Sequence, residues 1–152
     1  MSVSVKRAQL ENVKEVAELF NLYRIFYEQD SDMELAVDFI SERIKNKESA
    51  IFYAHDENNN ALGFTQLYPT FSSVSAQRSW VLNDLFVASG ARRLGVAKKL
   101  MQAAKTFAEE TNAKGIALET TEDNTKAQAL YESLGYEKSS GFYNYFLGLI
   151  TT

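Results

Sequence analysis

The sequence of 152 residues contains no cysteine and a single proline, Pro69. Without cysteine, disulfides and thiolate metal sites are excluded, and a reducing cytoplasm is the compartment we expect. No apolar run approaches the roughly 18 residues of a membrane span, and MSVSVKRAQLENV shows no secretory signal. We therefore expect no membrane insertion and no bound metal.

The chain also lacks a basic excess. Its 16 Lys and Arg residues stand against 20 Asp and Glu residues, a net charge of -4, which argues against a nucleic-acid partner and is compatible with a cationic substrate. The hydrophobic content of 45% is ordinary for a globular protein. Because no repeat, low-complexity tract or linker is visible, we predict one domain spanning residues 1–152.

Hydrophobic periodicity predicts strands and helices in the order βααβββαβαββ. Pro69 to Gln77 is predicted to be a loop, and the start of the first two helices is assigned to the capping-box pairs Asn12 with Glu15 and Ser31 with Glu34. Interleaved elements indicate an α/β or α+β class with a mixed sheet, in which the unit 78–87, 96–111, 115–120 forms a parallel crossover. The predicted strands are 3–8, 50–54, 61–68, 78–87, 115–120, 136–138 and 143–149.

The stretch ARRLGVAKKLM (91–101) stands where a strand passes into a helix. A helix start presents free N–H groups and a positive dipole end, and it binds phosphate readily. Gly95 lets a ligand approach the main chain, while Arg92, Arg93 and Lys98 add positive charge. The stretch thus fits a diphosphate-binding site. A turn with solvent-exposed arginines would have the same sequence pattern, so that alternative stays open. Neither a Walker motif nor G-x-G-x-x-G is present.

The pattern Arg92-x-x-Gly95-x-Ala97 resembles the acetyl-CoA signature of the GNAT superfamily of N-acetyltransferases, Q/R-x-x-G-x-G/A. The strand LNDLFV (82–87) resembles that family's central strand. Downstream, residues 124–136 (NTKAQALYESLGY) are similar to its second motif, N-x-x-A-x-x-L-Y-x-x-x-G-F. The resemblance covers almost the whole chain and implies a mixed sheet of about six to seven strands, splayed at the central strand and flanked by four helices.

The resemblance further implies that acetyl-CoA is the cofactor. Its diphosphate would sit on the loop and helix start, and its pantetheine arm would lie along the central strand. Asn124 would contact it by its amide, and Ala127 would be small enough to admit it; their alternative roles are helix capping and packing. The cofactor-binding residues implied in this way are Leu85, Phe86, Val87, Arg92, Arg93, Leu94, Gly95, Val96, Ala97, Lys98, Glu119, Asn124, Ala127 and Tyr131.

For catalysis, the resemblance implies that Tyr131 protonates the departing thiolate. A phenol has a reference pKa of about 10 against about 8.5 for a thiol, so it can donate that proton at neutral pH. Otherwise Tyr131 is a core aromatic. The polyamine acetyltransferases carry Glu-Asp where this chain has Asn83-Asp84. Asp84 is the candidate base, Glu119 is a second, and Asn83 and Asp84 would lie on opposite faces unless a bulge intervenes.

The resemblance is strongest to the diamine, polyamine and histone-type amine acetyltransferases, so we expect a small amine acceptor, polyamine-like or lysine-like. Aromatic and acidic residues near the first two helices and the hairpin suit such a cation, or else form a solvated acidic surface. A protein or peptide acetyltransferase, a non-catalytic CoA-binding module and a homodimer all remain open. The substrate-binding candidates are Tyr27, Glu28, Asp30, Trp80 and Asp84.

Overall fold

The computed structural model describes residues 2–92 and 94–150, and the chain divides into two compact units, Met1–Glu119 and Thr120–Thr152. The first unit is built on a mixed sheet with the strand order β1-β2-β3-β4-β5. The first four strands run antiparallel to their neighbours, and β5 joins β4 in parallel, as the crossover predicts. Their bounds are β1 Ser4–Arg7, β2 Ala50–His55, β3 Ala61–Ser72, β4 Gln77–Val87 and β5 Ile116–Ala117.

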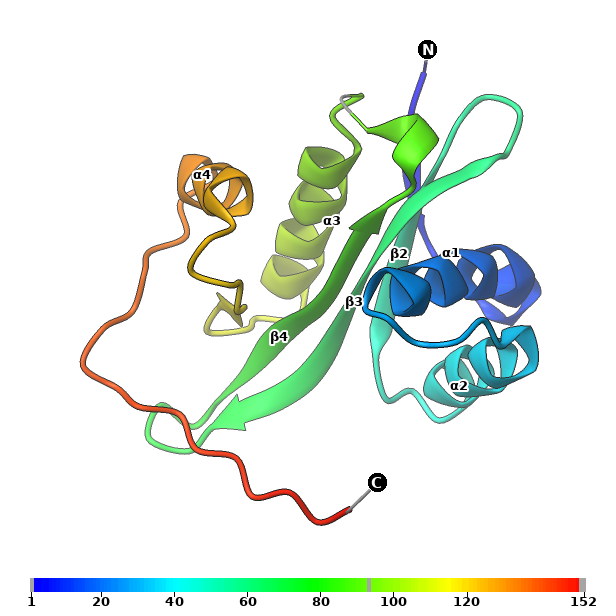
Figure 1. The fold of residues 1–152 in the computed structure, drawn as a ribbon. Helices are drawn as coiled ribbons and strands as arrows, with labels where there is room; N and C mark the ends of the chain where they lie inside the picture. The colour runs from blue at the N-terminus through cyan, green and yellow to red at the C-terminus, as the bar shows by residue number, and fades with distance from the viewer. Residues whose placement is uncertain (1, 93, 151–152) are drawn as a thin grey trace. The chain divides into compact units, whose positions relative to one another are not determined.

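Helices cover both faces of this sheet (Figure 1). On one face lie α1 (Val13–Phe26) and α2 (Met33–Lys45), where Phe20 packs against Phe39 at 5.2 Å and Phe64 at 6.2 Å between ring centroids. On the other face lies α3 (Val96–Glu110), whose Phe107 packs against Phe52 and Trp80. The second unit contains α4 (Thr125–Ser133). No helix in the described part of the chain is long and apolar enough to cross a membrane.

The number of strands is smaller than the six to seven predicted. The described residues form five strands, and neither 136–138 nor 143–149 pairs with another strand. Alternating aromatics such as Tyr143 and Tyr145, the latter 94% exposed, satisfy the pattern of a strand without supplying its hydrogen-bond partner. Strand 115–120 is likewise reduced to Ile116–Ala117.

Two helix starts differ from the predicted capping boxes. Asp32, not Ser31, caps α2 by accepting a 3.1 Å hydrogen bond from the backbone N–H of Leu35. Asn12 is the N-cap residue of α1, as predicted, but its side chain does not cap that helix. It accepts instead from the N–H of Gln9 at 3.0 Å, at the 3₁₀ turn η1 (Leu10–Asn12). Ser, Asp and Asn cap with similar strength, so in a run such as Asp30-Ser31-Asp32 the letters alone do not select the cap.

The β3–β4 hairpin extends further than predicted, with only residues 73–76 in the turn between the strands. Pro69 lies opposite Trp80 in the β3–β4 ladder. The backbone N–H of Trp80 points away from β3 and donates to the carbonyl oxygen of Gly115. Positions on antiparallel strands alternate between bonded and non-bonded pairs, so Pro69 removes no bond to β4. The predicted loop at Pro69 is therefore wrong for a specific reason, the register of the pair.

Gly63 is a site where we expect a single methyl group to destabilise the fold. A Cβ there would lie 2.7 Å from the carbonyl oxygen of Phe86 and 3.2 Å from Val96 Cγ1, where β3, β4 and the start of α3 converge. Gly63→Ala should lower the free energy of unfolding by about 1–3 kcal/mol, measured by urea denaturation. Gly90→Ala is the matched control, because a Cβ at Gly90 meets nothing within 4 Å. An equal loss of unfolding free energy in the two variants would contradict the close packing of β3, β4 and α3 at Gly63.

Candidate active site

A β-bulge at Asn83 determines which side chains meet at the middle of β4. Gln66 on β3 pairs with Asp84, and the next residue, Leu67, pairs with Leu82, so Asn83 has no partner on β3. Consecutive residues on β3 point to opposite faces, and so therefore do Leu82 and Asp84. The bulge turns Asp84 onto the face covered by α1, and the amide of Asn83 donates a 3.1 Å hydrogen bond to Asp84 Oδ1.

Asp84 is a carboxylate buried among neutral donors. It is 5% exposed and accepts a 2.7 Å hydrogen bond from Gln66 Nε2 and another from the phenol of Tyr23 on α1. Burial raises the pKa of Asp84, and the hydrogen bonds from Gln66, Tyr23 and Asn83 oppose that rise. A carboxylate whose pKa is raised by burial is a stronger proton acceptor than an exposed one, which is what a general base requires.

Two tyrosines share this face with Asp84. Burial and the negative charge of Asp84 raise the pKa of Tyr68 to about 12, and the same two causes raise the pKa of Tyr23 far above its usual range. Both phenols therefore stay protonated at neutral pH. Tyr23 donates to the carboxylate and Tyr68 lies within electrostatic reach of it, an environment that suits a cationic amine.

Among the described residues of the first unit, β4 beyond the bulge has no strand partner on the β5 side. The two strands pair only at Trp80 with Ile116 and Val81 with Ala117. The N–H of Ala88 bonds to Leu62 on β3, so by alternation Phe86 also faces β3, while the backbone groups of Leu85 and Val87 face the open side. An extended amide-containing arm could pair there as an added strand.

In the described part of the chain, no capping side chain accepts from the first N–H groups of α3. Gly95, the N-cap, has φ +72° and no side chain to accept a bond, whereas Asp32 caps α2 and Asn124 caps α4. A left-handed φ favours glycine, which accounts for Gly95 between the loop and the helix. The donors of Val96, Ala97 and Lys98 are thus available to an anion such as a diphosphate. This arrangement fits the nucleotide end of acetyl-CoA.

The charged residues of the loop are placed only in part. Arg92 is exposed, and its Nε donates a 3.3 Å hydrogen bond to the carbonyl oxygen of Val87 at the end of β4. Lys98 is exposed on the first turn of α3, and Leu94 is 38% exposed. Arg93, a predicted cofactor-binding residue, lies outside the described residues.

In the second unit, the predicted residues lie on or next to α4. Asn124 Oδ1 accepts a 3.1 Å hydrogen bond from the N–H of Ala127, which is the capping role foreseen as its alternative. Tyr131 is partly buried, with its ring 6.1 Å from that of Tyr136. Gly135 follows the helix at φ +94°, as expected of a residue that ends it.

The other predicted substrate residues are not gathered around Asp84. Trp80 is 6% exposed on the α3 face, where its indole N–H donates to Thr111 Oγ1 at 2.9 Å. Tyr27 is exposed at the end of α1, and its ring contacts that of Tyr23. Glu28 and Asp30 are exposed in the segment that follows, and Glu119 is exposed beyond β5.

Gln66 and Tyr23 were not singled out by sequence reasoning as site residues. In the sequence, Tyr23 recurs at helical spacing with Phe20 and Tyr27, and Gln66 is one residue inside the predicted strand 61–68. Their contact with Asp84 depends on the bulge at Asn83, which sets the register of β3 against β4. A polar residue in the middle of an otherwise apolar strand, as in LGFTQLY, was the available signal.

The fold, the unpaired edge of β4 and the glycine N-cap of α3 suit the binding of an acyl-CoA, and comparison with known proteins assigns the family. A family model described as Acetyltransferase (GNAT) family matches residues 13–136, and the chain belongs to this family. It is therefore an N-acetyltransferase with acetyl-CoA as its acyl donor.

The similarity to known proteins covers nearly the full chain. YhfO, an uncharacterized N-acetyltransferase of Bacillus subtilis (strain 168), is 46% identical over 147 residues, 97% of this chain and 98% of that protein. A probable acetyltransferase of Haemophilus influenzae (strain ATCC 51907 / DSM 11121 / KW20 / Rd) is 32% identical over 86% of this chain and 88% of its own. The crystal structure of a probable acetyltransferase superposes with a TM-score of 0.92 at 43% identity, covering 98% of this chain and 99% of that one.

Proposed function

We propose that the enzyme transfers the acetyl group of acetyl-CoA to a primary amine of a small cationic acceptor, either polyamine-like or lysine-like, in a ternary complex. The observation that carries this proposal is the buried carboxylate of Asp84, hydrogen-bonded by Gln66 and Tyr23 and within electrostatic reach of Tyr68. An ammonium group would be attracted by the charge and by the aromatic rings, and the same carboxylate can then remove its proton.

Asp84 is the proposed base. An alkylammonium has a reference pKa near 10.4, so the acceptor must lose a proton before its nitrogen can attack the thioester carbonyl carbon. Bound acetyl-CoA supplies the activated acetyl group. Asp84 would take one ammonium proton, directly or through one water, and the C–N bond would form as the C–S bond breaks. On the family resemblance, Tyr131 would give its phenolic proton to the departing sulfur. The second proton lost by the nitrogen would restore the phenol, and Asp84 would release its own proton to solvent. Asn83 lies beside the base and orients it by its 3.1 Å hydrogen bond.

The chain's own main-chain donors would hold the cofactor. We assign the diphosphate to residues 94–98, with the charges of Arg92 and Lys98 nearby, and the pantetheine arm to the open edge at Leu85 and Val87. The free N–H groups at the start of α3 and the unpaired stretch of β4 support this assignment. Arg93, Phe86, Glu119, Asn124 and Ala127 are retained as further cofactor-binding candidates on the family resemblance.

The acceptor class is tested by thiol release from acetyl-CoA with a panel of spermidine, cadaverine, free lysine and a lysine-containing peptide. Turnover with the small amines and little with the peptide supports the proposal. Turnover with the peptide alone would replace it by the protein acetyltransferase alternative. Acetyl-CoA binding in calorimetry without turnover on any amine would indicate a non-catalytic binding module instead.

Tyr131→Phe tests the proposed acid. Phenylalanine keeps the ring and removes the ionisable hydroxyl, so we expect kcat to fall about 10²-fold or more while the acetyl-CoA Kd changes little. The measurement pairs steady-state kinetics with calorimetry of cofactor binding. Tyr143→Phe, the same change at an exposed residue, is the control. Equal kcat in wild type and Tyr131→Phe would remove the acid role from Tyr131.

We further propose that residues 1–152 act as a single acetyltransferase domain. The family match over residues 13–136 includes parts of both compact units, which supports this proposal. A cytoplasmic location, a polyamine-type or histone-type acceptor and a homodimer are compatible with the sequence, and sedimentation of the purified protein tests the last of these.

A further inference from the structure

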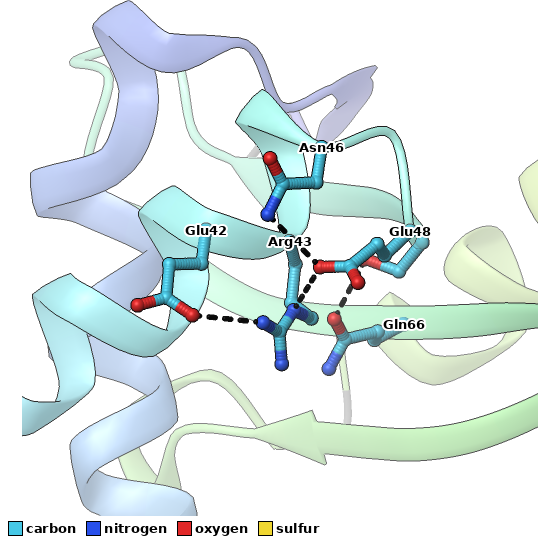
Figure 2. A network of polar contacts seen from close by, with 6 residues as sticks. Glu42, Arg43, Asn46, Glu48 and Gln66 are labelled. Atoms are coloured by element: carbon cyan, nitrogen blue, oxygen red, sulfur yellow. Dashed lines mark hydrogen bonds and ion pairs between the residues drawn. The ribbon is translucent and has the colours of Figure 1, made fainter.

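A chain of buried hydrogen bonds leads from the start of β2 to Asp84. Ser49 Oγ donates to Gln66 Oε1 at 2.8 Å, and Gln66 Nε2 donates to Asp84 Oδ2 at 2.7 Å. Gln66 is completely buried, and Ser49 is 8% exposed. Figure 2 shows the Gln66 amide with its oxygen turned toward the segment that follows α2 and its nitrogen turned away from it.

The surroundings of Ser49 hold this arrangement in place. Arg43 near the end of α2 bridges Glu42 and Glu48, each at 3.1 Å, and the amide of Asn46 donates to Glu48 (Figure 2). These contacts tie the α2–β2 connection together immediately before Ser49. The hydroxyl is thus presented to β3 by a segment with fixed polar contacts rather than by a free loop.

The two ends of an amide have opposite roles, and this makes the orientation of Gln66 matter. While the serine O–H occupies Oε1, the NH₂ group faces Asp84, and an NH₂ donor favours a carboxylate over a neutral carboxyl group. A rotated amide would present Oε1 instead, which accepts from a protonated carboxyl group. The Ser49 hydrogen bond also polarises the amide and strengthens its donor end.

No cationic side chain among the described residues is found to stabilise the ionised form of Asp84. The groups that face it are the phenol of Tyr23 from α1, the phenol of Tyr68 from β3 and the amide of Asn83 from β4. The charge of Arg43 lowers the pKa of Tyr68, and Arg43 forms ion pairs with Glu42 and Glu48. No ion pair between Asp84 and a cationic side chain occurs among the described residues, so neutral donors alone oppose the effect of burial.

The geometry points to Ser49 and Gln66 as positioning residues that keep Asp84 in its ionised, proton-accepting form. This inference rests on the proposed role of Asp84 as base and extends it: Gln66 sets the proton affinity of the carboxylate, and Ser49 sets the orientation of Gln66.

The test follows the ¹³Cγ resonance of Asp84 through a pH titration of the full chain without acceptor or cofactor. Gln66→Met keeps the length of the side chain and removes the donor, so we expect the titration midpoint to rise by roughly one pH unit, a tenfold change in proton affinity. Ser49→Ala should move it in the same direction by less. Ser49→Thr retains the hydroxyl and should titrate like wild type.

Thr65→Val is the structural control. The Thr65 hydroxyl donates to the backbone carbonyl of Asp84 at 2.8 Å, so its loss disturbs the same pair of strands without touching the carboxylate. We expect lower stability and an unchanged Asp84 midpoint. An unchanged Asp84 midpoint in Ser49→Ala overturns the role of Ser49. If Gln66→Met fails to fold, Ser49→Ala still tests the inference. Because the titration uses no acceptor, its outcome is separate from that of the amine panel.

Discussion

Asp84→Asn is expected to lower kcat by about 10²–10⁴-fold, the usual contribution of a general base. Asparagine matches aspartate in shape and retains an oxygen that can accept from Gln66, so the bulge and the packing should persist. The variant has no group that can take the ammonium proton. Acetyl-CoA affinity should change little, because the proposed cofactor contacts lie on the main chain of β4 and α3.

The measurement is steady-state turnover with the best amine of the panel, together with calorimetry of acetyl-CoA binding. Asp38→Asn makes the same chemical change at an exposed carboxylate of α2 and should retain wild-type kcat. Turnover of Asp84→Asn within twofold of wild type would show that the proton leaves by another route, and Glu119→Gln would then be examined next.

Gly95→Asp is expected to weaken acetyl-CoA binding by about tenfold or more relative to Gly95→Asn. Both side chains tolerate the left-handed region that φ +72° requires, so their backbone strain is similar. They differ in a negative charge placed beside the N–H groups assigned to the diphosphate. Repulsion between charges about 4 Å apart is worth roughly 1–4 kcal/mol near a protein surface.

Calorimetric Kd values for both variants at low and high salt measure this difference. Because salt screens exposed charges, the gap between Asp and Asn should narrow as ionic strength rises. A Kd that is the same for the two variants at low salt would mean that the diphosphate is bound elsewhere.

The helix start around Gly95 could be predicted from sequence because it depends on local features. A glycine at a required φ, small neighbours and the onset of a helical period are all written in consecutive letters, and the structure reproduces them at Gly95 and Val96. The parallel pairing of β4 with β5 was likewise predictable, since a strand–helix–strand unit allows few other arrangements.

The environment of Asp84 could not be predicted in the same way. It depends on one residue, Asn83, being left out of the β3–β4 ladder, which moves Asp84 to the α1 face and leaves Trp80 on the α3 face. A one-residue change of register reverses every side chain beyond it, and no local pattern states where that change falls. The predicted strands at 136–138 and 143–149 are wrong for a related reason. A segment's own sequence does not specify which strand it pairs with.

In the proposed complex, acetyl-CoA lies against the main chain at the start of α3 and along the unpaired edge of β4. Backbone ¹⁵N–¹H spectra recorded during an acetyl-CoA titration test it. The account predicts that the amides of Leu85, Val87 and residues 94–98 shift to saturation, while those of the hairpin turn at 73–76 stay in place. Saturation of binding with the 94–98 amides unmoved would contradict it.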